Sequence, residues 1–392
     1  MRILHVVPYY EDAWGYGGIP RLASALARGL ARRGHQVTVC TTDVADADHR
    51  VPPHARRDYD GVSVHVFRNL SNRLAYRYQF FTPVGLSGFL RRSAAQFDVA
   101  HLHACHHLPG AVAASALRRA GVPYLLSPNG TALRIERRRL AKLAFDLTIG
   151  SRVVPHAARV LAVSRAEDRQ LQSAGVPASR VRLVPNPIDE HEFAIAPEPR
   201  AFRAAHALGD GPVVLYLGTL TPRKGVDVLV RAFARMNDPS ARLVVAGNDM
   251  GSSAAIVALA RDAGLRDRFI RVGLLRGRDR LGALAAADVV VYPSRDEVFG
   301  LVPVEALLCG TPVVVSSDSG CGEVIGQLGG GHIVPVGDAI TLADAIAAIL
   351  RSPALWRARV ATAAARARQR FGTDVVCARL EEVYREVAGC AA

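Results

Sequence analysis

The feature that most constrains the fold is an alternation of short β-branched runs with longer segments of helical period, which the chain repeats in its second half. In the first half, the predicted strands are Ile3–Val7, Gln36–Thr41, Ser63–Phe67, Val99–His103, Tyr124–Ser127 and Val160–Val163. In the second half, they are Val213–Leu217, Arg242–Ala246, Phe269–Val272, Val289–Tyr292, Val313–Ser316 and His332–Val334. Such alternation is typical of parallel sheets covered by crossover helices. The sequence therefore predicts an α/β fold with two Rossmann-like, doubly wound domains.

The length of 392 residues suits two domains of this kind. We expect the first domain at residues 1–190 and the second at 205–370, with the Pro-rich, charged segment Asp189–Gly211 as the linker. A final amphipathic helix at about 373–388 is expected to pack back on the first domain. Because doubly wound sheets bind ligands at the carboxyl ends of their strands, two facing domains would place the substrates in a central cleft.

The charge and the cysteines restrict the class of protein. The formal net charge of +14 favours anionic partners such as phosphorylated small molecules, lipid surfaces or nucleic acid, although an Arg- and Ala-rich composition equally reflects a GC-rich genome. The six cysteines form no CxxC pair, and several lie in apolar surroundings typical of reduced core thiols. The N-terminus reads as a buried strand, and no uncharged apolar run reaches about 18 residues. We therefore expect a soluble, cytoplasmic protein.

The segment from Pro293 to Ala306 carries the clearest sign of chemistry. A predicted strand ends at Tyr292, and a helix begins near Val302, so the amides around Gly300 lie at a helix N-terminus on the carboxyl edge of a sheet. Such amides bind phosphate oxygens. Glu297 and Glu305 flank them, and we expect these carboxylates to bond hydroxyls rather than the phosphates. A solvated loop glutamate and a helix-dipole partner remain the alternative interpretations.

A cationic pair follows the first predicted strand of the second domain. Arg223 and Lys224 come after Val213–Leu217 and directly before Gly225 and a helix. At the carboxyl end of a strand, Arg can fork onto a phosphate and Lys can add a point charge. These residues are candidates for holding a diphosphate, and a solvated loop pair is the alternative.

These motifs, taken in order, resemble those of a known family. The ordered set is Gly17-Gly18, His101-Leu102-His103, Val163-Ser164, Val184–Asp189, Gly218 with Arg223-Lys224-Gly225, and two glutamates separated by seven residues at Glu297 and Glu305. It resembles the retaining GT-B glycosyltransferases of the glycogen-synthase-like group (family 4), typified by bacterial polysaccharide and phosphatidylinositol mannosyltransferases. The resemblance runs along nearly the whole chain.

The resemblance implies a retaining enzyme that moves a hexose from a nucleotide-diphosphate sugar to a glycan, lipid-linked or small-molecule acceptor, in bacterial polysaccharide or glycoconjugate biosynthesis. The first domain would bind the acceptor and the second the nucleotide sugar. In this family, cationic side chains replace a metal at the diphosphate, so no metal or other cofactor is expected.

The resemblance also implies roles for individual residues. The residues expected at the catalytic centre are His103 beside the reacting sugar, Arg223 and Lys224 on the diphosphate, and Glu297 on the transferred sugar. Glu305 is expected to bind the ribose of the donor. The other residues expected at the donor are Gly17 and Gly18 in a closing loop, Gly273 and Leu274 at the base, Phe299, Gly300, Leu301 and Val302 at the phosphates, and Thr219. The family commonly has arginine at the position of Thr219, and Arg223 is expected to supply the missing charge.

Metal and dinucleotide sites are the weaker interpretations. Asp46-Ala47-Asp48 matches a metal-binding Asp-x-Asp but follows a Rossmann-like strand, where that motif does not belong. A second set, His101, His103, Cys105 and His107, has zinc-ligand chemistry, although a strand end entering a cleft explains it as well. Gly15-Tyr16-Gly17-Gly18 is not GxGxxG, which disfavours a dehydrogenase.

Two basic segments suggest a membrane partner. Tyr76–Arg92 interleaves aromatic and basic residues, and Arg134–Lys142 adds five cations. The hypothesis is a patch that faces an anionic membrane at its inner, cytoplasmic side and recruits a lipid-linked acceptor; a solvated basic helix is the alternative. Nucleic acid is not expected as a partner, because the sequence has no recognised nucleic-acid-binding module. An epimerase-like sugar-nucleotide enzyme, a phosphorylase and a non-catalytic sugar-nucleotide-binding protein remain as rival functions.

Overall fold

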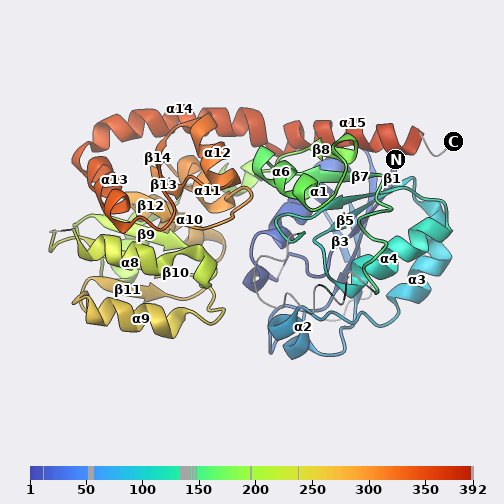
Figure 1. Cartoon of the computed structure of the whole chain (residues 1–392), viewed down its shortest axis with the longest axis horizontal. Coiled ribbons are helices and arrows are strands. Elements are labelled where there is room, and N and C mark those ends of the chain that lie inside the picture. The colour runs from blue at the N-terminus through green and yellow to red at the C-terminus, as the bar shows by residue number, and fades with distance from the viewer. Residues whose placement is uncertain are drawn as a thin grey trace. The chain divides into compact units, whose positions relative to one another are not determined.

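The computed structural model describes residues 1–11, 13–51, 57–132, 148–194, 197–236 and 238–389, together with residues 143 and 145. The chain divides into two compact units. Unit 1 comprises Met1–Pro187 and Thr373–Ala392, and unit 2 comprises Ile188–Gly372. Each unit is a parallel or mostly parallel sheet with helices on both faces (Figure 1). The predicted segment Arg134–Lys142 lies outside the described residues.

The sheet of unit 1 has the order β3-β4-β2-β1-β5-β6-β7-β8. Its strands are β1 (Arg2–Val6), β2 (Gln36–Thr42), β3 (Arg57–Tyr59), β4 (Val62–Phe67), β5 (Val99–His103), β6 (Tyr124–Ser127), β7 (Arg159–Ala162) and β8 (Val181–Leu183). All pairs are parallel except β3 with β4. The strand order reverses between β1 and β5, where His5 is paired with His101. Ligands bind at such a reversal in doubly wound sheets.

The helices of unit 1 are η1 (Trp14–Tyr16), α1 (Ile19–Arg32), α2 (Asn72–Tyr78), α3 (Leu86–Ser93), η2 (Ala94–Gln96), α4 (Leu108–Arg119), α6 (Arg165–Ser173), η3 (Ala178–Arg180) and α15 (Thr373–Gly389). Three of these helices, α2, α4 and α6, begin at residues whose side chains cap them. Ser71, His107 and Ser164 each accept a hydrogen bond from a backbone amide of the helix that follows. Such caps satisfy amides that have no partner within the helix.

Helix α15 completes unit 1 although it lies at the far end of the sequence. It packs on α1 at Gly29, where an added Cβ would come within 2.5 Å of Thr373 Cγ2 and 2.7 Å of Cys377 Sγ. Glu381 on α15 is bonded by Arg33 and His35, and these partners hold the pKa of its carboxyl down at about 2. The two helices therefore meet through close packing and through charge.

The sheet of unit 2 has the order β11-β10-β9-β12-β13-β14, with every pair parallel. Its strands are β9 (Val213–Leu217), β10 (Arg242–Ala246), β11 (Phe269–Val272), β12 (Val289–Tyr292), β13 (Val313–Ser316) and β14 (Gly331–Val334). Its helices are η4 (Glu190–Ala194), α7 (Pro199–Ala205), η5 (Pro222–Lys224), α8 (Val226–Ala234), α9 (Ser253–Asp262), α10 (Gly277–Ala286), α11 (Leu301–Leu308), α12 (Gly320–Leu328), α13 (Ala339–Arg351) and α14 (Pro353–Phe371). This order, 3-2-1-4-5-6, is that of a Rossmann sheet and reverses between β9 and β12.

The predicted strands match the structure to within a residue or two at either end. The segment Asp189–Gly211 is not a plain linker, because it forms η4 and α7, and α7 packs against α10 within unit 2. In the described part of the chain, no single helix has the length and apolar character to cross a membrane; the sharply bent pair α13–α14 meets that criterion only when its two helices are counted together.

Candidate functional site

The predicted cationic pair and the predicted glutamate loop leave neighbouring strands of unit 2. Lys224 follows β9, and Glu297 follows β12, so both lie at the carboxyl edge of the sheet, where the strand order reverses. Gly225 lets the two loops touch, because it adopts a φ of +65° and a Cβ there would overlap the carbonyl oxygen of Pro293. The backbone is tied again where the amide of Arg295 donates to the carbonyl of Arg223 at 2.8 Å.

Lys224 and Glu297 form an ion pair that Tyr292 shares. The ammonium of Lys224 donates to the Tyr292 hydroxyl at 2.6 Å, and that hydroxyl donates to Glu297 Oε2 at 3.3 Å. The ammonium also lies 4.8 Å from the centre of the Tyr292 ring. An ammonium has three N–H donors, and these contacts use two of them. The third has no partner among the residues that the structure describes, so it can donate to an anionic ligand.

Burial and charge act in opposite directions on Glu297. Burial raises the pKa of its carboxyl, but the charges of Lys224 and Arg223 and the hydrogen bonds from Lys224 and Tyr292 leave that pKa lowered overall. Burial raises the pKa of the Tyr292 hydroxyl, which the neighbouring Glu297 charge raises further. At neutral pH the carboxylate is therefore ionised and the phenol keeps its proton.

The chain contains only two lysines among its 49 basic residues. Lys224 is one of them, and it is 7% exposed. Lysine is a compact point charge with three rotatable donors, whereas arginine is a planar fork. In a chain that uses arginine almost everywhere else, lysine at this buried position indicates a need for those three donors. Composition alone could have signalled this residue.

Arg223 is half-buried beside the same loop. Its guanidinium donates to the carbonyl of Asp296 at 3.2 Å, next to Glu297. Thr219, at the position where the family commonly has arginine, accepts through its carbonyl a hydrogen bond of 2.9 Å from the Tyr216 hydroxyl. Arg223 and Lys224 thus place two positive charges on this loop.

The N-terminus of α11 presents amides without a side-chain cap. Its N-cap is Gly300, which has a φ of +78° and no side chain to bond the first turn. A Cβ at Gly300 would overlap Cys321 Sγ, so glycine is required for the loop to lie this close to α12. Leu301 and Val302 are half-buried, and Phe299 is buried with its ring 5.2 Å from that of Phe371. A helix N-terminus of this form attracts anions.

Glu305 has a partner that sequence reasoning missed. Its carboxylate pairs with Arg280 of α10 at 2.5 Å, and Arg280 also pairs with Glu192 at 2.6 Å. Arg280 and Glu305 are both buried. Arg280 lies 25 residues before Glu305 in a helix that looks ordinary in sequence, so no local motif points to it. The role of Glu305 at a ribose stays a prediction.

The remaining unit 2 residues lie at the ends of strands. Gly273 directly follows β11 and has open space where a Cβ would stand, and Leu274 is 37% exposed. Their position after a strand is compatible with a flat ligand group above the sheet edge. Contact of these residues with a base stays a prediction.

The unit 1 residues lie around the reversal between β1 and β5. His103 ends β5 and is fully buried. Gly17 has a φ of +97° and open space at its Cβ, and Gly18 is the N-cap of α1, which no side chain caps. All three therefore lie near the carboxyl edge of unit 1, and their action on a donor held by unit 2 stays a prediction.

The structure regroups the histidines that had suggested zinc. His101 and His103 gather with His5, and a ring nitrogen from each lies within 4.8 Å of the others. His107 instead caps α4 and bonds the carbonyl of His103 at 2.8 Å. Asp46 bonds the amides of Asp48 and His49 in a tight turn.

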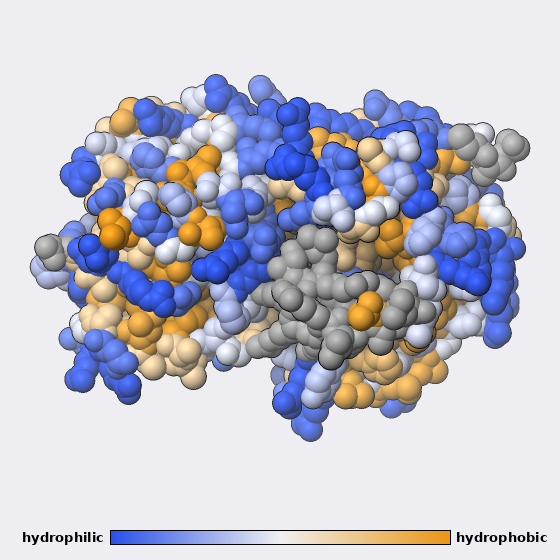
Figure 2. All heavy atoms as spheres, in the orientation of Figure 1, coloured by the Kyte–Doolittle hydropathy of each residue, from blue (hydrophilic) through white to orange (hydrophobic). Residues whose placement is uncertain are grey.

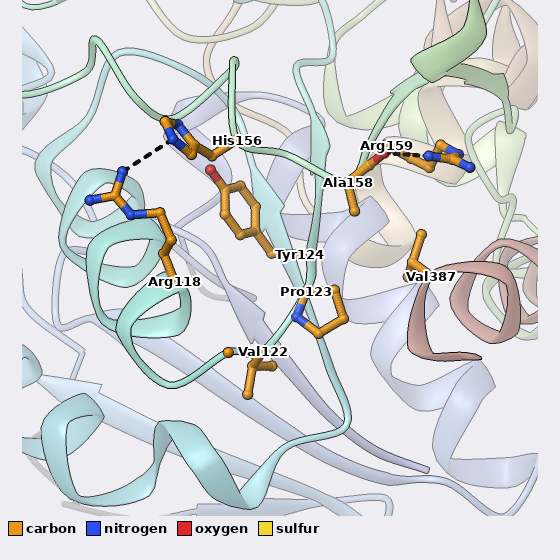
Figure 3. A pocket seen from close by; sticks show the side chains of 9 residues that line it. Arg118, Val122, Pro123, Tyr124, His156, Ala158, Arg159 and Val387 are labelled. Atoms are coloured by element: carbon orange, nitrogen blue, oxygen red, sulfur yellow. Dashed lines mark hydrogen bonds between the residues drawn. The ribbon is translucent and has the colours of Figure 1, made fainter. Parts of the chain in front are cut away.

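A pocket of about 290 Å³ in unit 1 lies at the other edge of the sheet. Its lining includes Tyr124 and Arg159, the first residues of β6 and β7, and Val387 of α15 (Figure 3). The Arg118 guanidinium donates to His156 across its rim at 3.4 Å. Ligands of doubly wound sheets bind at the carboxyl ends of strands, so this pocket is not the donor site.

Known protein families match both halves of the chain. Residues 16–192 match the family described as Glycosyltransferase Family 4, and residues 199–368 match Glycosyl transferases group 1. The chain is similar to the D-inositol 3-phosphate glycosyltransferase of Xylanimonas cellulosilytica, with 32% identity over 98% of this chain and 96% of that relative. The relative of the same description from Acidothermus cellulolyticus is 32% identical over 97% of this chain and 87% of its own length.

Solved structures show the same architecture. Anabaena HepE, in complex with UDP and glucose, is similar at a TM-score of 0.77 and 22% identity, covering 98% of this chain and 99% of that one. Sucrose-phosphate synthase from Thermosynechococcus elongatus is similar at a TM-score of 0.76 and 23% identity, covering 99% of each chain. With relatives this similar along nearly its whole length, the chain belongs to glycosyltransferase family 4, has the two-domain GT-B fold and is a transferase enzyme.

Proposed function

We propose that this enzyme transfers a hexosyl group from a nucleotide-diphosphate sugar to an acceptor hydroxyl with retention of anomeric configuration. The bond between the anomeric carbon and the β-phosphate oxygen breaks, and a bond from the acceptor oxygen to that carbon forms on the same face. The departing phosphate oxygen takes the acceptor proton, and the nucleoside diphosphate is released. The observation that carries the proposal is the Lys224–Tyr292–Glu297 cluster beside the uncapped N-terminus of α11.

In this proposal, unit 2 stabilises the charge of the leaving nucleotide. As the anomeric carbon becomes cationic, negative charge grows on the diphosphate. The third N–H of Lys224, the Arg223 guanidinium and the first amides of α11 are fixed donors that can meet this charge. Because Glu297 is ionised and tied to Lys224, its carboxylate can accept hydrogen bonds from sugar hydroxyls. Donors already held in place require little reorganisation in the transition state.

We propose that no divalent metal is needed for this step. Lys224 and Arg223 supply two positive charges on one loop of unit 2. The Glu297 carboxylate is paired with Lys224 rather than available as a metal ligand. Turnover should therefore persist in excess EDTA, and a requirement for added Mg²⁺ or Mn²⁺ would contradict this part.

The names of the relatives favour a phosphorylated cyclic polyol as the acceptor class. Both relatives described above are D-inositol 3-phosphate glycosyltransferases and are similar over nearly the whole chain. A polyol phosphate offers hydroxyl nucleophiles and an anionic group, which suits a chain with a net charge of +14.

A second acceptor class, a lipid-linked sugar at an anionic membrane, is favoured by an apolar surface on unit 1. Five large apolar side chains around α2 are 45–68% exposed: Leu70, Leu74, Tyr78, Phe80 and Val84. Arg73 and Arg77 are exposed on the same helix. Figure 2 shows apolar atoms beside hydrophilic ones at the end of unit 1 that carries α2. Apolar side chains flanked by arginines are typical of segments that lie on anionic membranes.

The donor is tested first, by thermal unfolding with a panel of nucleotide sugars. A true donor at a hundred times its Kd stabilises the folded state by about 2.7 kcal/mol. Lys224→Ala should remove most of this stabilisation, whereas Lys142→Ala, which replaces the only other lysine, should keep it. Stabilisation by no nucleotide sugar, or equal stabilisation of both variants, would overturn the donor assignment.

The acceptor and the stereochemistry are tested with the donor so identified. D-inositol 3-phosphate is offered in solution, and lipid-linked sugars are offered in vesicles of anionic phospholipid. The anomeric proton coupling of the product, read by NMR, should match that of the donor; an inverted product would exclude retention. Flotation with the vesicles that is lost in Leu74→Ser/Phe80→Ser would support the membrane class. Turnover of the soluble acceptor by that same variant at the wild-type rate would favour the polyol.

A further inference from the structure

Three histidines of unit 1 form a cluster that the predicted chemistry leaves mostly unused. His101 and His103 are on one face of β5, and His5 faces them from β1, its parallel neighbour. All three are completely buried. Tyr384 of α15 and Ser127 of β6, both buried, lie against the same cluster. These five residues come from β1, β5, β6 and α15.

Hydrogen bonds join the five side chains into one unbranched chain. His103 Nε2 bonds His5 Nδ1 at 3.0 Å, and His5 Nε2 bonds the Tyr384 hydroxyl at 3.3 Å. The same hydroxyl bonds His101 Nδ1 at 2.8 Å, and His101 Nε2 bonds the Ser127 hydroxyl at 2.6 Å. The chain therefore begins at His103, at the carboxyl edge of the sheet, and passes through α15 before it returns to β6.

The hydrogens in this chain can be counted. Burial lowers the pKa values of all three histidines, and neighbouring histidines lower those of His101 and His103 further, so each ring is neutral and has one N–H. A neutral ring with both nitrogens bonded must donate at one and accept at the other, and a bonded hydroxyl between two rings must do the same. The direction of one bond consequently fixes the direction of all four.

Only two arrangements satisfy this count. In the first, Ser127 donates to His101 and every later bond points toward His103, whose Nδ1 then carries the hydrogen. In the second, every bond points toward Ser127, and His103 Nδ1 is a lone pair. Among the described residues, His103 Nδ1 is buried and makes no hydrogen bond. The protein thus keeps one ring nitrogen of His103 unsatisfied at the edge where such sheets bind ligands.

A bound metal explains the cluster less well. The three rings offer nitrogens close enough to share an ion. However, five of their six nitrogens already bond another side chain, so a metal would displace bonds at 2.6–3.3 Å that are complete without it. A metal also needs a free ring nitrogen from each histidine. The hydrogen-bond chain accounts for every nitrogen except His103 Nδ1.

We propose that Tyr384 is a positioning residue for His103: through His5 it sets which nitrogen of His103 carries the hydrogen, and so whether Nδ1 meets the reacting sugar as a donor or as an acceptor. This inference rests on the proposed function and on the prediction from the family resemblance that His103 lies beside the reacting sugar. The tautomer of a histidine follows from the bond that its other nitrogen makes. Here that bond is the one between His103 and His5, and its direction depends on Tyr384 of α15, near the C-terminal end of the sequence.

The test is Tyr384→Phe, which keeps the ring and removes only the central oxygen of the chain. The matched control is Tyr124→Phe, because Tyr124 is also a buried tyrosine of unit 1, and its hydroxyl bonds the carbonyl of Val153 outside the histidine cluster. Long-range proton–nitrogen NMR on histidine-labelled protein reports the tautomer of each ring. We expect the His103 nitrogen shifts to change in Tyr384→Phe and to stay at wild-type values in Tyr124→Phe.

Kinetics give a second readout. Tyr384→Phe should lower kcat tenfold or more and leave the donor KM within about twofold, since unit 2 binds the donor. In a His103→Ala background, the same substitution should lower kcat no further, because its effect passes through His103. An additional fall in that background would show a merely structural role and overturn the proposal, as would unchanged His103 shifts in Tyr384→Phe.

The outcomes separate this inference from the proposed function. Should the wild-type protein turn over no nucleotide sugar, the function fails while the NMR comparison still decides the hydrogen-bond chain. Should Tyr384→Phe not fold, Ser127→Ala interrupts the chain at its other end and must also shift the His103 nitrogens, four bonds away. If the purified protein contains stoichiometric metal and His5→Ala does not, the histidines form a metal site rather than a chain of hydrogen bonds, and the proposal is refuted.

Discussion

Lys224 holds Glu297 twice, once by a direct ion pair and once through the hydroxyl of Tyr292, which accepts from the ammonium at 2.6 Å and donates to the carboxylate at 3.3 Å. The two charges come from loops that follow adjacent strands, and Tyr292 is the last residue of one of those strands. The position of the pair is therefore set by a residue of the sheet, Tyr292, as well as by the two loops.

The Tyr292 hydroxyl should matter more for turnover than for donor affinity. Tyr292→Phe keeps the ring beside Lys224 but removes the bridge to Glu297. Hydrogen bonds to charged groups contribute about 1.5–3 kcal/mol, so we expect kcat to fall roughly ten- to a hundredfold with a smaller change in donor KM. Steady-state kinetics with the donor found in the thermal screen measure both. A rise in donor KM with unchanged kcat would show that the Tyr292 bridge contributes equally to binding the donor in the ground state and in the transition state, and would contradict this prediction.

Arg280 should be a large contributor to the stability of unit 2. Arg280→Met removes the guanidinium that pairs with the buried Glu305 carboxylate, and breaking a buried ion pair in this way costs about 3–5 kcal/mol of unfolding free energy. The double variant Arg280→Met/Glu305→Gln removes both charges and should recover part of that loss. Urea unfolding followed by circular dichroism gives the free energies. Arg261→Met serves as the control, because Arg261 is exposed and, among the residues that the structure describes, its ion-pair partner is the exposed neighbour Asp262. Equal stability of Arg280→Met and this control would contradict the interpretation.

Gly29 should be required for the packing of α1 against α15. Gly29→Ala places a methyl group against Thr373 and Cys377, and overpacking of this kind costs about 1–3 kcal/mol. The matched control is Gly88→Ala in α3, where the nearest atom, on the flexible end of Arg92, is 3.5 Å from the new Cβ. Alanine inside a helix is favoured over glycine by about 0.5–1 kcal/mol, so this control should be neutral or stabilising. Calorimetric Tm values for the two variants should move in opposite directions.

Acid should destabilise unit 1 through its buried histidines. Burial lowers the pKa of His5 to about 3 and that of His107 to about 4, and lowers those of His101 and His103 as well. Between pH 6.5 and about 4, the unfolded chain binds more protons than the folded one, so the free energy of unfolding falls as pH is lowered. Each histidine contributes up to about 1.4 kcal/mol per pH unit.

The carboxyl of Glu167 has the opposite effect on the free energy of unfolding over the same pH range. Burial raises the pKa of Glu167 to about 7, so its protonated form is favoured in the folded state, and acid relieves one unfavourable charge. With four histidines against one glutamate, the net effect remains a loss of stability below pH 6.5. His107→Asn retains a helix-capping residue and should reduce the pH slope by about one proton. A urea midpoint that is flat from pH 7 to pH 4.5 would refute this account.

Strand positions could be predicted from the sequence because buried parallel strands are continuous β-branched runs, such as Val289–Tyr292. Helix α12 has no clear signal in the sequence, because it begins Gly320-Cys321-Gly322, which is typical of a turn. Helices α2 and α3 are likewise hidden in the sequence, because the stretch Tyr76–Arg92 contains the end of one helix and the start of the next. In each case, tertiary packing decided the conformation against local propensity.

Individual site residues could be predicted where a motif directly follows a strand. Contacts between site residues could not be predicted, because they depend on the order of the strands in the sheet. Lys224 and Glu297 each follow a recognisable strand, but their contact depends on β9 lying beside β12, which no local pattern reveals. The same holds in unit 1, where His5 is a lone histidine in an apolar run. Its partners lie 98 and 379 residues away, at His103 and Tyr384.

The division of unit 1 across the sequence has a consequence for biosynthesis. A ribosome adding about 5–20 residues per second needs roughly 10–40 seconds to pass from Pro187 to Thr373. Throughout that interval, α15 has not been made, so the surface of α1 at Gly29 is uncovered and His101 lacks its hydrogen bond to the Tyr384 hydroxyl. By the end of the interval, all the residues of unit 2 have been translated. The domain that starts second is thus ready first, and the nascent amino-terminal half must wait for the last helix to be translated before its histidine cluster can close.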